Sequence, residues 1–186
     1  GNAFSGNGGT FTDSGNTGQA VTENGQAKRT TEAEYKFATD GVGYRMDGTG
    51  DYLSVAAHAN WDFDSGDFTV EMWLNSKSFS GLVNDDIMSI TIDSNNKVHL
   101  FNADNGGIKF RAYDAGLVVQ MIQGVRSTRQ GVWYHLAIVR NGNEWDAYID
   151  GVSVANVTDS SDMPDLSAAA VQFGSGATGV DFNGYM

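Results

Sequence analysis

Polar and hydrophobic residues alternate along several short segments of the chain, with the period of two that places successive side chains on opposite faces of a β-strand. Residues 68–74 show the clearest pattern, because every second side chain there is apolar. We expect the apolar face to enter the core and the other face, which carries Glu71 and Trp73, to point outward. The predicted core positions of this strand are Phe68, Val70, Met72 and Leu74.

Further segments with strand character recur at spacings of about ten residues, which is typical of an antiparallel sandwich. Turn-forming residues separate them at 47–51, 95–96, 105–107 and 141–143. Residues 165–170 are the only segment expected to form a short helical turn. Short strands joined by turns are also expected in the glycine-rich first forty residues. The other predicted strands are 44–46, 52–55, 87–92, 97–101, 108–113, 117–122, 133–139, 145–149 and 171–173.

The segment 133–139 is apolar on both faces, as expected for a central strand, and the turn at 141–143 would pair it with 145–149. The opposite face of this pair would carry an aromatic and acidic patch beside Glu71 and Trp73. The predicted core residues of the pair are Leu136, Ile138, Ala147 and Ile149. The predicted further members of the patch are Trp133, His135, Asp146 and Tyr148.

The composition narrows the function classes. With 186 residues, 24 glycines and one proline, the chain is expected to form one domain with many tight turns. Eleven Lys and Arg against 23 Asp and Glu give a net charge of −12, which argues against nucleic-acid binding because phosphate grooves need concentrated positive charge. The absence of cysteine excludes disulfides and thiol chemistry. No apolar run approaches the ~20 residues that span a bilayer, so no membrane insertion is expected.

The most suggestive catalytic pattern is a strand with alternating acids. Glu144 and Asp146 would share one face, as the paired carboxylates of a retaining glycoside hydrolase do. The next position on that face is Tyr148, however, and Asp150 belongs to the closing turn. The sequence therefore predicts no catalytic residues and no enzyme. The histidines, which also belong to no catalytic motif, are His58, His99 and His135.

A calcium site is one interpretation of the glycine-containing turn between Asp47 and Asp51. Their carboxylates, together with carbonyl oxygens of the turn, could supply the many oxygen ligands that calcium needs. The same pattern is typical of a tight turn closed by Asx hydrogen bonds. Both interpretations stay open at this point. If calcium binds Asp47 and Asp51, we expect a structural role for it.

Three stretches, taken in their order, resemble a known family. They are 46–53, 67–73, and 133–140 followed by 147–151. They resemble the laminin G-like jelly rolls of the concanavalin A-like lectin and glucanase superfamily, especially those of phage tail and virion proteins. The resemblance covers residues 11–185 and implies an all-β, antiparallel jelly-roll β-sandwich, with residues 1–186 as a single domain.

The resemblance also concerns the end of the chain. The family usually continues past the motif at 182–186 with an acidic pair and one more apolar strand. We therefore expect either a fragment of a longer chain, or a domain without the family's last strand whose open sheet edge accepts a partner.

The aromatic and acidic patch suits sugars, whose apolar faces stack on aromatic rings while their hydroxyls bond carboxylates. Aromatic side chains serve protein partners equally well, or fill a second layer under loops. We expect a non-catalytic recognition or scaffolding module of a larger virion or extracellular surface protein, with glycans and other subunits of the assembly as candidate partners. The alternatives are a purely structural virion assembly or decoration protein and, with less support, a glycoside hydrolase.

Overall fold

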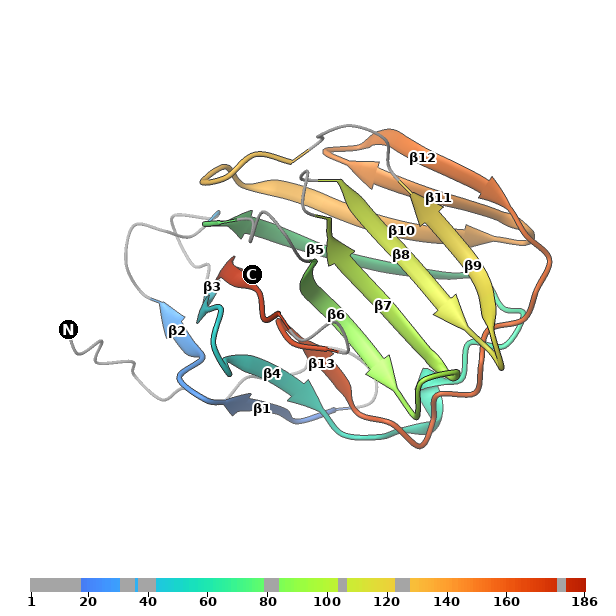
Figure 1. Ribbon diagram of the computed structural model, residues 1–186, viewed down its shortest axis with the longest axis horizontal. Helices are drawn as coiled ribbons and strands as arrows, with labels where there is room; N and C mark the ends of the chain where they lie inside the picture. Colours follow the sequence, from blue (N-terminus) through green and yellow to red (C-terminus); the bar gives the residue numbers. More distant parts are fainter. Residues whose placement is uncertain are drawn as a thin grey trace.

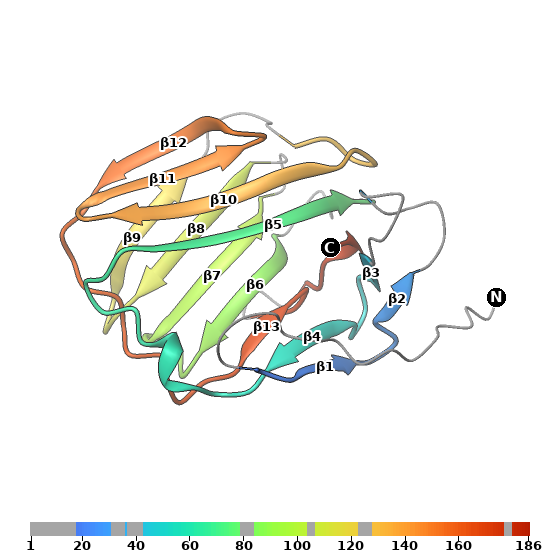
Figure 2. The same cartoon turned by 180° about the vertical axis from the view of Figure 1, so that it is seen from behind.

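Two antiparallel sheets pack face to face (Figures 1 and 2). The computed structural model describes residues 18–30, 36, 43–78, 84–103, 107–122, 128–176 and 180–186. Within these residues each sheet has seven strands. The first sheet has the order β1 (Val21–Asn24), β4 (Tyr52–Val55), β13 (Val171–Phe173), β6 (Asp85–Thr91), β7 (Lys97–Asn102), β8 (Ile108–Tyr113) and β9 (Leu117–Ile122). The second has the order β12 (Val152–Thr158), β11 (Glu144–Ile149), β10 (Tyr134–Asn141), β5 (Phe68–Ser76), β14 (Asn183–Tyr185), β3 (Gly43–Asp47) and β2 (Lys28–Thr30).

The core lies between the inner faces of the two sheets. Trp145 of β11 is completely buried there and makes an edge contact with Phe68 at 5.5 Å between ring centroids. It also lies 5.8 Å from the ring of Phe110, which belongs to β8 of the first sheet. Burial of a large apolar side chain contributes roughly 1.5–3 kcal/mol, so such contacts hold the sheets together. Other fully buried core residues are Leu74, Ile87, Leu100, Leu136 and Ile138.

A buried arginine fastens two loops to the edge of this core. Arg140 is 2% exposed, and its guanidinium lies 4.9 Å from the ring of Trp145. It donates hydrogen bonds to the carbonyl oxygens of Gly142 (3.1 Å), Asp64 (2.9 Å) and Ser161 (3.0 Å). A buried cation is tolerated only when its donors are satisfied, so this arginine has a structural role.

Two of the connections between the sheets are neighbouring turns. One joins β1 to β2 and the other joins β3 to β4. The buried carboxylate of Asp51 bridges them, because it accepts hydrogen bonds from the backbone N–H of Gln26 and from that of Asp47. The turns approach so closely that a Cβ on Gly25 would overlap the carbonyl oxygen of Gly50, and Gly25 also has a positive φ of 68°. Only glycine fits there without strain.

The predicted all-β, antiparallel jelly-roll sandwich is confirmed. The segments 108–113, 117–122 and 171–173 match β8, β9 and β13 residue for residue, and the predicted central strand is β10, between β5 and β11. The predicted core positions also lie inside: Leu74, Leu136, Ile138, Ala147 and Ile149 are buried, and Phe68, Val70 and Met72 pack partly buried against the core.

Four elements differ from the prediction. A short 3₁₀ helix, η1 (Ala59–Trp61), forms where no helical turn was expected, and the His58 side chain caps it by accepting the N–H of Asn60 (3.1 Å). Strand β14 was not among the predicted strands, although it lies between β5 and β3. Strand β12 was not predicted, because a bulge opposite Ala147 and Tyr148 interrupts the polar–apolar alternation of its sequence. Residues 165–170 form one hydrogen-bonded turn, from the N–H of Ala169 to the carbonyl oxygen of Leu166 (2.9 Å), and no helix. The strands predicted before residue 18 and the turn at 105–106 lie outside the described residues.

Candidate functional site

Five of the six side chains of the predicted patch occupy positions on the outer face of the second sheet, which Figure 2 views from outside, and Trp133 directly precedes β10. Strand register explains this, because Trp73 of β5 lies directly opposite His135 of β10. In the next row Ala137 lies between Glu71 of β5 and Tyr148 of β11. We call this surface the aromatic–acidic face. It consists of Glu71, Trp73, Trp133, His135, Asp146 and Tyr148.

Three of these side chains form a contact cluster. The rings of Trp73 and His135 lie 5.1 Å apart at 54°, and His135 Nε2 lies 3.5 Å from a carboxylate oxygen of Glu71. The side chain of Glu71 is 64% exposed and that of His135 is 26% exposed. The ammonium of Lys36 lies 4.4 Å from the centroid of the Trp73 ring, a favourable cation–π arrangement. An aromatic surface and an exposed carboxylate are therefore presented side by side.

The other members of the face extend this cluster in two directions. Toward the edge strand, Asp146 accepts a hydrogen bond from the Ser153 hydroxyl (3.2 Å), and Tyr148 is half-buried. Toward β14, Trp133 packs on Tyr185, with ring centroids 6.2 Å apart. Trp133 is thus partly engaged in packing, while Trp73 lies in the centre of the face.

The acids of β11 are each held by neighbours. The Glu144 carboxylate accepts the hydroxyl of Thr158 at 2.9 and 3.0 Å, at the far end of the sheet. Asp150 lies in the turn after β11, has a positive φ of 51°, and accepts the backbone N–H of His135 (2.9 Å). The three same-face positions of β11 are Glu144, Asp146 and Tyr148, as predicted from the sequence.

Asp47 and Asp51 have a structural role that the geometry explains. Both oxygens of Asp51 accept backbone N–H groups, and Asp47 accepts that of Thr49 (2.9 Å). Across the turn, Gly50 donates its N–H to Asp181 (2.6 Å). Among the described residues, no group of three or more His, Asp or Glu side chains is arranged to hold a metal ion. Calcium at Asp47 and Asp51 stays a prediction.

A pocket of about 110 Å³ lies beside this turn, at the edge formed by β2 and β3. Residues of both charges line the pocket: Lys28, Arg29 and Arg45 are basic, and Asp47 and Asp51 are acidic. The two carboxylates already accept hydrogen bonds from backbone N–H groups. The pocket is therefore the solvent-exposed side of these turns.

The sequence interpretation missed a second outer surface, on the first sheet. Basic and aromatic side chains alternate there along β7 and β8, in register with one another. The signal was present in the sequence, because residues 97–101 and 109–113 alternate polar with apolar positions. It was interpreted as strand formation alone.

None of the described residues belongs to a helix long and apolar enough to cross a membrane.

Comparisons with known proteins agree with this geometry. A comparison with curated protein sequences found no match. Among solved structures, mouse laminin α1 chain domains LG4-5 have a TM-score of 0.60 at 16% identity, over 77% of this chain and 38% of that chain. Domain 4 of AbnA, an extracellular GH43 arabinanase from Geobacillus stearothermophilus, has a TM-score of 0.59 at 15% identity, over 90% and 78%. The binding domain of botulinum neurotoxin DC has a TM-score of 0.65 at 12% identity, over 95% and 44%.

These likenesses establish a shared fold, and this chain spans well under half the length of the laminin and neurotoxin chains. The family is shown by a sequence model, described as the concanavalin A-like lectin/glucanases superfamily, that matches residues 47–186. The matched region contains both sheets' central strands and the whole aromatic–acidic face. The chain therefore belongs to the concanavalin A-like lectin/glucanases superfamily.

Proposed function

We propose that this chain is a non-catalytic carbohydrate-recognition module of an extracellular or surface protein, with its sugar on the aromatic–acidic face. The observation that carries the proposal is the contact cluster of Glu71, Trp73 and His135 on an outer sheet face. The apolar side of a sugar ring stacks on an aromatic ring, and its hydroxyls donate to a carboxylate. Two of the similar structures support the ligand class, since they are complexes with arabinotriose and with SialylT.

The position of Lys36 sets a condition on binding. Its ammonium already lies 4.4 Å from the Trp73 ring, on the surface that a sugar would use. Because Lys36 is exposed and its side chain is flexible, a sugar that stacks on Trp73 displaces it toward solvent. The ligand must then offer more contact to the ring than the single cation does.

The proposal of a non-catalytic role follows from the acids of this face. Retaining glycoside hydrolases need two carboxyl groups about 5–5.5 Å apart across the scissile bond. Here Glu144 and Asp146 each accept a hydroxyl of β12, and a tyrosine occupies the third same-face position. The most exposed acid of the face, Glu71, lies beside His135 and serves recognition. The virion or phage-tail setting, and a purely structural assembly role, stay predictions from the family resemblance.

Glycan-array binding with the whole chain, followed by calorimetry on the best ligand, tests the proposal. We expect Trp73→Ala to weaken binding at least tenfold, because it removes the stacking surface, and Trp73→Phe to retain most of the affinity. Glu71→Gln should weaken binding about five- to tenfold, because one charge-assisted hydrogen bond is lost.

Glu144→Gln is the matched control, since it removes the same charge from the same sheet face but away from the cluster. It should leave affinity unchanged within about twofold, and no reducing ends should appear with any bound glycan. The proposal is overturned if no glycan binds the folded chain, or if Glu144→Gln and Trp73→Ala weaken binding equally.

A further inference from the structure

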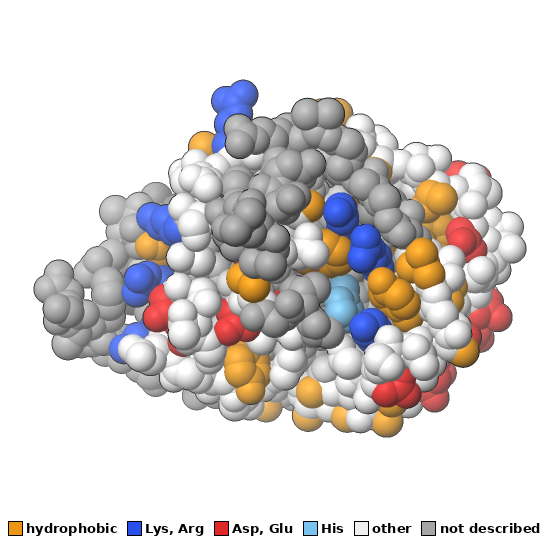
Figure 3. All heavy atoms as spheres, viewed as in Figure 1, with side chains coloured by type: hydrophobic (Ala, Val, Ile, Leu, Met, Phe, Trp, Pro, Cys, Tyr) orange, Lys and Arg blue, Asp and Glu red, His pale blue; other side chains and the backbone are white. Residues whose placement is uncertain are grey.

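The outer face of the first sheet carries an ordered array of rings and cations. Strands β7 and β8 are antiparallel neighbours, and three cross-strand pairs on this face each combine one ring with one cation. We call this surface the basic–aromatic face, which Figure 3 shows as a histidine flanked by basic and hydrophobic side chains. Its pairs are Lys97 with Tyr113, Arg111 with His99, and Lys109 with Phe101.

Two of the cations lie over the ring of their own pair, and Arg111 lies over the ring of the neighbouring pair. Lys97 Nζ lies 5.0 Å from the ring centroid of Tyr113, and the Arg111 guanidinium lies 5.3 Å from that of Phe101. Lys109 Nζ lies 6.0 Å from the same phenylalanine ring. A ring attracts a cation but accepts few of its hydrogen bonds, so these N–H donors are held in place and left available.

No described carboxylate forms an ion pair with these side chains. Within the described part of the chain, no ion pair involves Lys97, Lys109 or Arg111, although the protein as a whole carries a net charge of −12. Three of only eleven Lys and Arg residues are therefore concentrated on two adjacent strands. Asp93 interacts electrostatically with Lys97 but makes no ion pair with it, so the array keeps a local positive charge.

Two buried polar atoms of the array have no hydrogen-bond partner in the described structure. They are Nε of Arg111 and Nε2 of His99, whose side chain is only 4% exposed. Burial and the charges of Lys97 and Arg111 lower the pKa of His99 to about 4, so its ring is neutral near pH 7. Buried polar atoms without partners are costly, and a ligand that brings hydrogen-bonding groups to them would remove that cost.

From this array we infer a second binding site, separate from the aromatic–acidic face, for a saccharide that carries carboxylate or sulfate groups. Arginine and lysine side chains bind such oxyanions through charge-assisted hydrogen bonds. The half-buried ring of Tyr113 lies beside Lys97 and offers a surface for sugar carbons. Phe101 is only 1% exposed, so its ring positions the cations of Arg111 and Lys109 without facing a ligand. Same-face positions along each strand repeat at roughly 6.5 Å, so the site suits an extended chain with repeated acidic groups. A nucleic acid fits less well, because its binding rests on many phosphate contacts and this array supplies three cations.

The experiment measures the affinity of the whole chain for heparin, a sulfated saccharide, and for polygalacturonate, a carboxylated one. Neutral dextran and a single-stranded DNA oligonucleotide are measured at the same ionic strength. We expect heparin or polygalacturonate to bind at least tenfold more tightly than dextran and DNA, and whichever of the two binds more tightly identifies the anionic group. The double variant Lys97→Gln/Lys109→Gln should weaken that binding at least tenfold.

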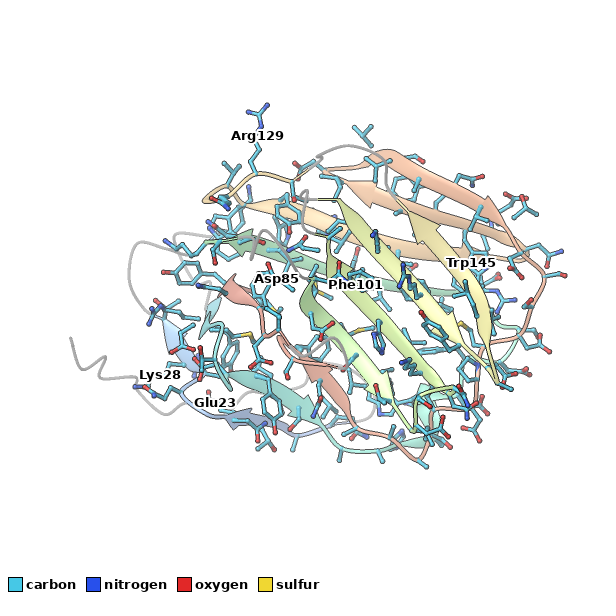
Figure 4. The ribbon with its side chains drawn as sticks, in the orientation of Figure 1. Glu23, Lys28, Asp85, Phe101, Arg129 and Trp145 are labelled. Carbon is cyan, nitrogen blue, oxygen red and sulfur yellow. The ribbon has the colours of Figure 1, made fainter. Side chains whose placement is uncertain are left out.

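Two variants serve as controls. Arg129→Gln removes one exposed positive charge outside the array (Figure 4) and should change affinity less than twofold. Trp73→Ala should leave it unchanged, because that residue lies on the other sheet, so this site and the proposed glycan site can fail separately. Arg111→Gln, checked for folding by circular dichroism, should weaken binding more than either lysine change alone.

Three results would overturn the inference. One is the absence of binding to both anionic saccharides. Another is binding to DNA with equal or higher affinity, which would assign the face to nucleic acid. The last is an equal loss of affinity in Arg129→Gln and in the double lysine variant, which would show diffuse charge attraction with no defined site.

Discussion

The two outer faces of this sandwich have the same backbone geometry and opposite chemistry. On the second sheet, the pair of Trp73 and His135 lies beside the exposed carboxylate of Glu71. On the first sheet, the pair of His99 and Arg111 lies among lysines, with no described acid in ion-pair contact. In both cases antiparallel register brings a ring next to a charged group. The fold supplies the pairing, and the residues at alternate positions decide the charge of the ligand.

The histidines show how burial adds to this contrast. His135 has a side chain that is 26% exposed and faces a carboxylate 3.5 Å away. His99 is 4% exposed and lies between two cations. The same residue type thus serves as a hydrogen-bonding surface group on one sheet and as a neutral, buried ring on the other.

The largest effect is expected where the two faces depend on one shared core. Trp145→Ala should lower the free energy of unfolding by about 3–5 kcal/mol, because it opens a cavity between Phe68 and Phe110. Urea denaturation measures the loss, and Trp145→Phe should lose less. Because both faces are built on this core, both binding activities should fall in proportion to the folded fraction of the variant. A loss below about 1 kcal/mol would contradict this role of the tryptophan.

The next effect sharpens the contrast between the histidines. The pKa of His99 is about 4 in the folded chain and about 6.5 when unfolded, so folding favours the neutral ring. The contribution of the neutral ring to the free energy of unfolding is complete above pH 6.5. It is lost as the pH falls from 6.5 to 4, by up to about 3 kcal/mol. His99→Gln should therefore flatten the stability profile between pH 7 and pH 4.

The matched control is His135→Gln, on the opposite sheet. Urea midpoints at several pH values are compared with those of the unchanged chain, so that titrating carboxylates cancel. An unaltered pH profile in His99→Gln would show that the ring is not the buried neutral group described above.

A smaller effect is expected where the chain crosses from one sheet to the other. Asp51→Asn replaces an oxygen that accepts a backbone N–H by an amide group that donates, and should cost about 1–3 kcal/mol. Asp47→Asn should cost less, because Asp47 is exposed and accepts only the Thr49 N–H. Thermal unfolding measures both. Affinity at either face should stay within about twofold, and a selective loss at one face would show that the turn belongs to that site.

Much of the fold could be predicted from the sequence because alternation is a local property. The core face of β5 and the pairing of β10 with β11 follow from the spacing of apolar residues and from one tight turn. Where a bulge shifts the register, as in β12, the alternation fails and so did the prediction. The same parity assigns the residues of the aromatic–acidic face to the outward side of their own strands, and the pairing of β5 with β10 and of β10 with β11 joins them into one surface.

The sequence by itself determined the fold class, the strand faces and the low count of basic residues, because these follow from residue order and composition. Only the tertiary structure decided which strands become neighbours, and therefore which side chains meet. The contact of Glu71 with His135, the bridge of Asp51 between two crossovers, and the array of Lys97, Arg111 and Lys109 all depend on pairing. Register and burial are set by the packing of the whole sandwich, which no local pattern contains.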